Sequence, residues 1–135
     1  MHALCLRMLP LVYPELPLAR ITAVQTASQA SADRVRRELG PDVLATTSLD
    51  QLLSHPGMQV IDCCAPTGDH ARIAQAVITA GKAFFCEKPL AATLAESEQI
   101  VALAAEHRIV QGERSSGLGA VPGILARGSD RCRRG

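Results

Sequence analysis

The sequence predicts an α/β fold in which short parallel strands alternate with helices. Short apolar runs rich in β-branched residues recur along the chain, stretches with helical spacing separate them, and glycine or proline stands near many of their ends. Hydrophobic residues make up 47% of the chain, but aromatic residues only 2%. A core of Ala, Leu, Val and Ile is typical of parallel sheets that helices cover. The 135 residues suffice for one domain and are too few for a typical two-domain enzyme.

The first third of the chain predicts a helix, a strand and a second helix. Residues 4–12 carry apolar side chains at helical spacing, and two prolines are expected to end this helix. The β-branched run at residues 20–25 predicts a strand. Ser31 is expected to cap the next helix, which Gly40 and Pro41 stop.

The middle of the chain predicts two more strands, at residues 43–46 and 60–65. Between them, Ser48 and Gln51 have the spacing of a capping box for a short helix. After the second of these strands, Thr67 is expected to cap a helix that continues as far as the next glycine.

The remaining elements repeat the same alternation. Residues 83–86 predict a buried strand, and Thr93 with Glu96 predicts a capping box for a helix that reaches about His107. Ile109-Val110 predicts a last strand. Regular alternation of strands and helices is typical of repeated βα units, which build a parallel sheet.

Composition and charge argue against several classes of function. The net charge of +1 and the pI near 7.7 indicate no general attraction to nucleic acid or to membranes. The scarcity of aromatic residues also disfavours single-stranded nucleic acid as a partner. Five cysteines, an odd number, do not suit the disulfide framework of a small secreted domain, so a reducing, cytoplasmic location is expected. Arg7 and Pro10 interrupt the apolar N-terminus, which indicates no export signal.

Three adjoining segments resemble a known family. They are Cys64-Ala65-Pro66-Thr67-Gly68-Asp69-His70, Ala80-Gly81-Lys82 and Glu87-Lys88-Pro89-Leu90. In order and spacing they resemble the second half of the nucleotide-binding domain of the Gfo/Idh/MocA oxidoreductases, the family of glucose-fructose oxidoreductase and inositol dehydrogenase. The resemblance implies a Rossmann-like, doubly wound parallel sheet, NAD or NADP as cofactor, and a dehydrogenase acting on a hydroxyl of a sugar, a polyol or a related small molecule. It leaves open whether the protein is a homo-oligomer.

The resemblance also predicts how the chain is divided. Residues 1–112 are expected to form a partial NAD(P)-binding domain, and residues 113–135 an irregular or disordered tail rich in glycine and arginine. The family's first strand and glycine-rich turn are missing, so the strands at 21–25 and 60–64 are expected roughly 9–10 Å apart, two strand spacings. Either these strands pair directly or the isolated chain is marginally stable. Without the missing parts, the isolated chain is expected to have no turnover, and a truncated gene model would explain the pattern.

Two predicted loops carry the candidate site residues. Both follow strands of a parallel sheet, and ligands of such sheets lie beyond the carboxyl ends of the strands, so the loops should face one crevice. An ammonium group near a reacting hydroxyl can stabilise developing alkoxide charge or relay its proton. By resemblance, the nicotinamide ribose lies along Pro66, Thr67 and His70, the substrate contacts the catalytic residue Lys88, Glu87 lies on the cofactor side, and Pro89 sets the turn, with a cis bond as one option.

Each of these residues also has a simpler interpretation. Thr67 is equally explained as an ordinary helix cap, Lys88 as a solvated surface lysine, and His70 as a half-buried histidine with satisfied hydrogen bonds. Gln25-Thr26-Ala27-Ser28 replaces the acidic residue that usually holds the adenosine ribose, so the choice between NAD and NADP stays open.

The cysteines near the predicted site suggest packing rather than a metal centre. Cys63, Cys64 and Cys86 could join His70 around zinc, but the sequence has no Cys-x-x-Cys or His-x-x-x-His spacing. Cys63 and Cys64 are adjacent in a strand and should therefore point to opposite faces of the sheet. A second function stays open beside the dehydrogenase: a noncatalytic binding or interaction module that pairs its exposed strand edges with a partner.

Overall fold

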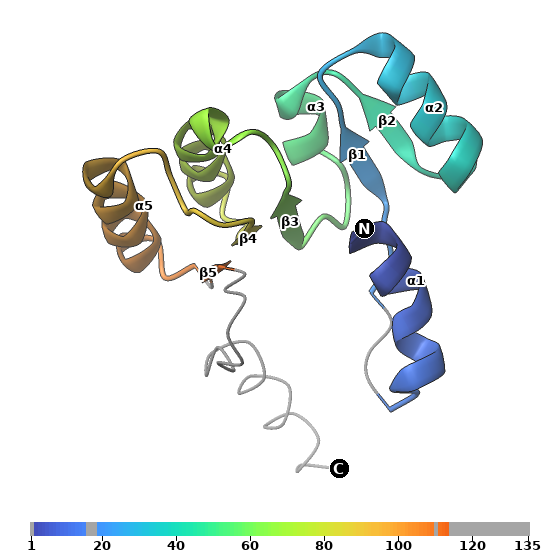
Figure 1. Ribbon diagram of the computed structural model, residues 1–135, viewed down its shortest axis with the longest axis horizontal. Helices are drawn as coiled ribbons and strands as arrows, with labels where there is room; N and C mark the ends of the chain where they lie inside the picture. The colour runs from blue at the N-terminus through green and yellow to red at the C-terminus, as the bar shows by residue number, and fades with distance from the viewer. Residues whose placement is uncertain (1, 16–18, 110, 114–135) are drawn as a thin grey trace. The chain divides into compact units, whose positions relative to one another are not determined.

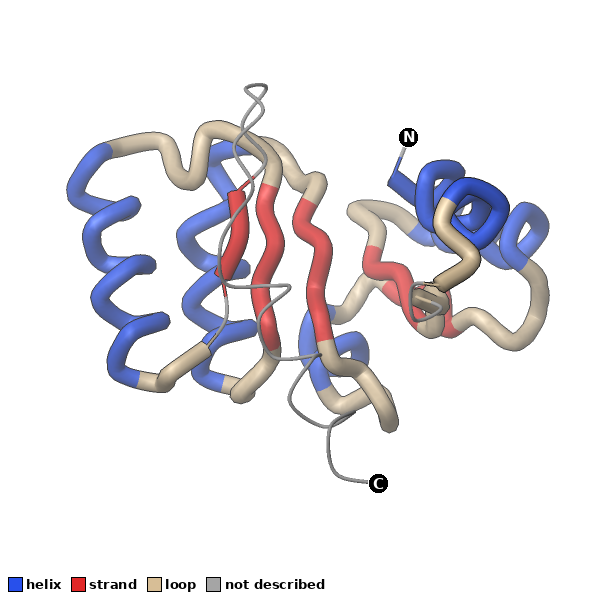
Figure 2. Tube along the Cα trace, turned by 90° about the horizontal axis from the view of Figure 1, so that it is seen from below, coloured by secondary structure: helices blue, strands red, loops and turns tan. Residues whose placement is uncertain are grey.

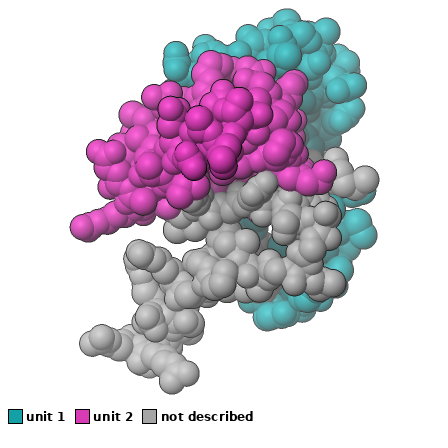
Figure 3. All heavy atoms as spheres, turned by 60° about the vertical axis from the view of Figure 1, so that its left-hand side comes forward, with its two compact units in different colours: residues 1–58 teal, residues 59–135 magenta. Residues whose placement is uncertain are grey.

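The computed structural model describes residues 2–15, 19–109 and 111–113 (Figure 1). The chain divides into two compact units, residues 1–58 and residues 59–135, which Figure 3 colours teal and magenta. Every strand pair in the described residues is parallel, which confirms the predicted α/β class. No helix in this described part combines the length and the apolar character needed to cross a membrane.

The first unit contains three helices and one pair of strands. Its elements in chain order are α1 (His2–Val12), β1 (Ala23–Gln25), α2 (Gln29–Leu39), β2 (Leu44–Thr46) and α3 (Leu49–Leu53). Strands β1 and β2 pair with Ala23 opposite Leu44, and α2 and α3 pack against both strands. The left-handed φ of 98° at Gly40 lets the chain leave α2, as the sequence predicts.

The predicted caps of the first unit need correction. Ser28, not Ser31, caps α2: its extended backbone places Oγ where it accepts a hydrogen bond from the Ser31 amide at 3.3 Å. Ser48 does cap α3, but Gln51 forms no full capping box because its side chain bonds to the Thr46 hydroxyl instead. Helix α1 also continues past its internal proline to Val12.

The second unit is a three-stranded sheet with two helices. Its elements are β3 (Val60–Cys63), α4 (Thr67–Thr79), β4 (Ala83–Cys86), α5 (Leu94–Glu106) and β5 (Gln111–Glu113). The strand order is β3-β4-β5, and these three strands lie side by side in Figure 2. Helix α4 packs on β3 and β4, and α5 packs on α4. The capping box of Thr93 and Glu96 at the start of α5 is confirmed.

The core of the second unit follows the periodicity of its elements. Alternate residues of β3 and β4 are buried, as expected for strands with one covered face. Along α4 the buried positions recur every three or four residues, which is the spacing of one helix face. The residues buried in this way are Ile61, Cys63, His70, Ile73, Ala74, Val77, Ile78, Phe84 and Cys86.

One open alternative about the sheet is decided, and one expectation is corrected. The described strands form two separate sheets, because β1 pairs with β2 and β3 pairs with β4, so the strands on either side of the predicted gap do not pair directly. The last strand among the described residues is Gln111–Glu113, and Ile109 does not belong to it, because the amide of Ile109 closes α5 with a hydrogen bond to the Ala104 carbonyl at 2.9 Å. Glu113 therefore belongs to a strand and not to the predicted tail. Val110 and residues 114–135 lie outside the described residues.

Candidate functional site

Two loops leave the second sheet at the carboxyl ends of its neighbouring strands. Strands β3 and β4 run parallel with Cys63 opposite Cys86, so the loops that follow these residues start side by side. The amide of Glu87 donates a hydrogen bond to the Cys63 carbonyl at 3.0 Å, which continues the pairing into the second loop. The peptide bond between Lys88 and Pro89 is cis. The predicted placement of both loops at the carboxyl ends of neighbouring strands is confirmed.

His70 ties these two loops together. It is the fourth residue of α4 and is only 1% exposed. One ring nitrogen, Nε2, lies 2.8 Å from the Ala65 carbonyl oxygen, and the other, Nδ1, lies 2.9 Å from the Pro89 carbonyl oxygen. Ala65 belongs to the first loop and Pro89 to the second, so one imidazole ring fastens the two backbones at a fixed separation.

The hydrogen bonds of His70 also define its charge. A carbonyl oxygen can only accept a hydrogen bond, so both contacts are made at once only when both ring nitrogens carry hydrogen, as in the imidazolium cation. Burial opposes the charged form, but the hydrogen bonds to the carbonyls of Ala65 and Pro89 outweigh it and raise the pKa of His70. The structure therefore places His70 beneath the loops, with both nitrogens engaged by the backbone.

The predicted cap at Thr67 is not present. Thr67 is the first residue of α4, the cap position belongs to Pro66, and no side chain caps this helix. Pro66 has an extended backbone, with φ −58° and ψ 143°, and is the last residue before the helix. Thr67 is therefore already inside the helix, whereas a capping residue must stand before it. The half-buried Thr67 hydroxyl thus stands at the helix start without the capping role that would occupy it.

The second loop presents a cation at the same edge. Lys88 and Pro89 are exposed, and Glu87 before them is half-buried. None of the ion pairs formed between described residues includes Lys88. The ammonium group of Lys88 and the hydroxyl of Thr67 are therefore carried by loops that begin at paired positions of one sheet.

Two cysteines lie directly below the loops. Cys63, Cys86 and His70 are buried, and their sulfur and ring nitrogen atoms lie within 4.8 Å of one another. A hydrogen bond from Cys86 lowers the pKa of Cys63 to about 6 against the effect of burial, with help from the Ala65 amide and the charge of His70. Cys64 follows the end of β3 and is exposed, so the packing that the sequence suggested for the cysteines does not hold for this one. Partial burial together with the charge of Asp62 raises the pKa of Cys64 to about 11.

Sequence reasoning missed the pairing of Cys63 with Cys86, although a signal for it exists. Each cysteine ends its strand and stands three residues before a proline, Pro66 in one case and Pro89 in the other. Equal offsets from equivalent loops predict equal positions along neighbouring parallel strands. The partners of His70 left no comparable signal, because they are backbone carbonyls.

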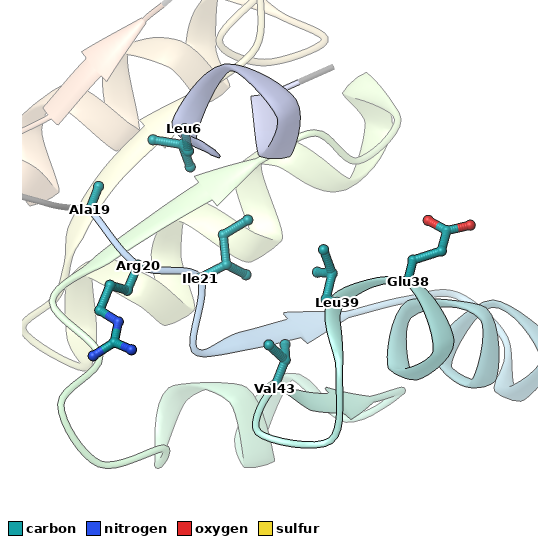
Figure 4. Close-up of a pocket in the computed structure, with 7 residues that line it drawn as sticks. All are labelled: Leu6, Ala19, Arg20, Ile21, Glu38, Leu39 and Val43. Carbon is teal, nitrogen blue, oxygen red and sulfur yellow. The ribbon is translucent and has the colours of Figure 1, made fainter. Parts of the chain in front are cut away.

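The first unit has a hollow of its own, of about 370 Å³ (Figure 4). None of the predicted site residues lines it. It is lined by one cation, one carboxylate and five apolar residues, which are Arg20, Glu38, Leu6, Ala19, Ile21, Leu39 and Val43.

Comparisons with known proteins agree with the geometry of the second unit. The model of an oxidoreductase family with an NAD-binding Rossmann fold, GFO/IDH/MocA, matches residues 7–112. Inositol 2-dehydrogenase 1 of Saccharopolyspora erythraea is 35% identical over 96 residues, which are 71% of this chain and 27% of that protein. An NAD-binding oxidoreductase from Klebsiella pneumoniae has a similar structure, with a TM-score of 0.77, 30% identity, and coverage of 84% of this chain and 30% of that one.

A structure of levoglucosan dehydrogenase in complex with NADH and levoglucosan is also similar. It has a TM-score of 0.74 and 28% identity, over 83% of this chain and 30% of that one. The chain thus spans less than a third of the relatives described here.

Proposed function

The chain belongs to the Gfo/Idh/MocA family of oxidoreductases, and from that premise we propose that it carries the nicotinamide side of an NAD(P)-dependent dehydrogenase. The substrate class is a small molecule with a reactive hydroxyl, such as a sugar or a polyol. The parallel register of β3 and β4 is the observation that carries this proposal, because it brings the loops of Thr67 and Lys88 to one edge. Carboxyl edges of parallel strands are where such folds bind their ligands.

The residues present fit one end of the cofactor better than the other. Around the nicotinamide ribose, Pro66, Thr67, Glu87 and Pro89 would form the binding surface, with the Thr67 hydroxyl as a hydrogen-bonding group. For the diphosphate, the sequence holds no Gly-x-Gly-x-x-Gly turn. At the end of β1, where an acidic residue would hold the adenosine ribose, the Gln25 amide donates to the carbonyls of Thr26 and Thr47 instead.

Lys88 is the catalytic residue of this proposal, and His70 is a positioning residue. A bound nicotinamide cofactor would supply the hydride acceptor for the carbon that bears the substrate hydroxyl. The Lys88 side chain would contact that hydroxyl: as an ammonium it would stabilise the negative charge that grows on the oxygen, whereas as a neutral amine it would accept the hydroxyl proton. His70 acts through the Ala65 and Pro89 carbonyls, which set the separation of the two loops.

Binding of cofactor fragments tests the proposal on the chain itself. We expect reduced nicotinamide mononucleotide to perturb the amide NMR signals of residues 64–70 and 87–90. NADH and NADPH should bind no more than about threefold more tightly than this half, because the chain offers little to the diphosphate. Adenosine monophosphate should leave the same signals unchanged.

Matched variants separate the loops from the rest of the surface. Thr67→Ala should weaken binding of the mononucleotide roughly two- to tenfold, the effect of one hydrogen bond of about 0.5–1.5 kcal/mol. Thr79→Ala, at the other end of α4, should not. Lys88→Ala is likewise compared with Lys82→Ala, since Lys82 stands before β4 and Lys88 after it. Perturbations confined to other residues, or equal effects of both members of a pair, would refute the proposal.

A noncatalytic interaction module is the second candidate. The observation that favours it is the edge position of β3, whose one hydrogen-bonded neighbour among the described strands is β4. Edge strands can pair with a partner chain. Sedimentation at increasing protein concentration distinguishes the candidates: reversible association that broadens the β3 amide signals favours the module, and a concentration-independent monomer favours the nucleotide-binding role. A cytoplasmic location accompanies the dehydrogenase proposal and is supported by the odd number of cysteines.

A further inference from the structure

The dehydrogenase proposal gives no role to the two buried sulfur atoms beneath the loops. Cys63 is 4% exposed and Cys86 is fully buried, and both project from the covered face of their strands toward α4. Neither residue reaches the surface where Thr67 and Lys88 stand. Their chemistry therefore needs its own explanation.

The positions of the two cysteines suit a covalent bond between them. They are register partners on neighbouring parallel strands. Such strands are about 4.8 Å apart, within the range of roughly 4.4–6.8 Å over which a disulfide joins two Cα atoms. The thiol of Cys86 already donates a hydrogen bond to the Cys63 sulfur. No other two described cysteines are both buried, because Cys64 and Cys5 are exposed.

The third member of the cluster favours thiol chemistry over metal binding. A metal needs a lone pair on one ring nitrogen of His70, but both nitrogens lie against carbonyl oxygens. Both contacts favour the protonated ring beside the sulfurs, and a cation near a cysteine stabilises the thiolate, which is the nucleophilic form. The hydrogen bond from Cys86 is the largest cause of the lowered pKa of Cys63, and the charge of His70 lowers it further.

We propose that Cys63 and Cys86 form a reversible disulfide modification site that hydrogen peroxide oxidises. The Cys63 thiolate attacks one peroxide oxygen and breaks the O–O bond, which gives a sulfenic acid and hydroxide. The hydroxide takes a proton from solvent. The Cys86 thiol then attacks the sulfenic sulfur, the S–S bond forms, and a second water leaves. The two sulfurs together lose two electrons, which reduce the peroxide, and a dithiol restores the reduced pair. This inference does not depend on nucleotide binding.

The test uses the full chain with only the two relevant cysteines. In a variant with Cys5→Ser, Cys64→Ser and Cys132→Ser, we expect hydrogen peroxide to remove two hydrogen atoms from the intact mass without dimer formation. Peptide mass spectrometry should then find Cys63 linked to Cys86, and dithiothreitol should reverse the change. The matched control carries Cys63→Ser in place of Cys64→Ser, so that Cys64 and Cys86 are its two remaining cysteines. No intramolecular link should form in it.

A further variant tests the role of the protonated ring. His70→Gln in the same background should slow formation of the link by about tenfold, because the thiolate loses its nearby positive charge. Circular dichroism verifies that this variant remains folded. If it unfolds, the peroxide treatment of the two-cysteine chain with His70 intact decides the proposal. The proposal is overturned if the two-cysteine chain keeps both thiols through peroxide treatment, if the control links as fast, or if the purified protein holds zinc in a stoichiometric amount.

Discussion

The two units of this protein repeat the same local pattern of strand and helix but bury different side chains. Among the described residues, the first unit buries two alanines, Ala32 and Ala45, and two larger apolar side chains, Leu52 and Met58. The second buries Phe84, Ile78 and Val77 almost completely, together with Ile61 and Ile73. Burial of large apolar side chains is the main source of stability. The difference indicates that the second unit is the more stable scaffold.

The buried polar groups of the units differ in the same direction. In the first unit, the Thr46 hydroxyl bonds to the amide of Ser48 and to the side chain of Gln51, which are two and five residues away. In the second unit, His70 bonds to Pro89, which is 19 residues away. One group organises a single turn and the other fastens two separate loops. The candidate site therefore depends on a hydrogen bond between distant segments, which needs the larger core around it.

The largest expected effect comes from the aromatic core of the second unit. Phe84→Ala should lower the free energy of unfolding of this unit by about 3–5 kcal/mol, because it removes a fully buried side chain and leaves a cavity. Hydrogen exchange of the amides in β3, α4 and β4 measures the loss.

Two controls make this prediction specific. Phe85→Ala changes the neighbouring, half-buried residue and should lower stability by only about 1 kcal/mol. Leu52→Ala should lower the protection of the α3 and β2 amides from hydrogen exchange, while the amides of the second unit keep their protection. Loss of protection throughout the chain from either unit would show that the two units unfold together and would break the comparison.

Removal of the imidazole clamp should have the next largest effect. His70→Ala leaves the carbonyls of Ala65 and Pro89 without their donor, and we expect a loss of about 2–3 kcal/mol in the stability of the second unit. Urea titration followed by circular dichroism measures it. His70→Gln keeps one donor group and should recover part of the loss, whereas equal losses would indicate that packing, not hydrogen bonding, accounts for the effect.

Helix caps should contribute less, and equally, in both units. Thr93→Ala removes the capping box of α5, and Ser28→Ala removes the cap of α2. Each should lower the stability of its own unit by about 1 kcal/mol. Exchange rates of the first-turn amides of each helix provide the measurement, and a change in α5 caused by Ser28→Ala would contradict the separation of the units.

The smallest expected effect is chemical and concerns Cys64. Since its pKa is raised to about 11, the folded chain keeps this thiol protonated between pH 9 and 11, where the unfolded chain releases the proton. Stability therefore falls as the pH rises through this window. At pH 8, iodoacetamide should modify Cys64 about tenfold more slowly in the folded chain than in urea. Tandem mass spectrometry that resolves Cys64 from Cys63 gives both rates, and equal rates would show that the folded environment does not protect Cys64.

Much of the fold was predictable because local chemistry determines it. The strand at residues 83–86 has the predicted bounds, and the spacing of Thr93 and Glu96 suffices for their capping box. The cap of α2 was not predictable, because Ser28 and Ser31 are equally good capping residues and only the backbone angles decide between them.

The position of the candidate site was predictable, but the hydrogen bonds that hold its two loops together were not. Parallel strands brought the loops of Thr67 and Lys88 to one edge, as the alternation of strands and helices requires. A half-buried His70 with satisfied hydrogen bonds was one of the two interpretations of the sequence, but its partners could not be predicted, because they are carbonyl groups, which every residue carries. The division of the strands into two sheets depends on hydrogen bonds between distant segments and has no local signal.

The clamp of His70 has a consequence for how such a site can be inherited. Both strands, the helix between them and both carbonyl partners fall within residues 60–89, so the arrangement travels as one uninterrupted stretch of gene. A recombination event that joins this stretch to a different upstream sequence transfers the geometry of the loops complete. Chimeras built at such junctions can therefore exchange the upstream sequence while preserving the separation of the two loops.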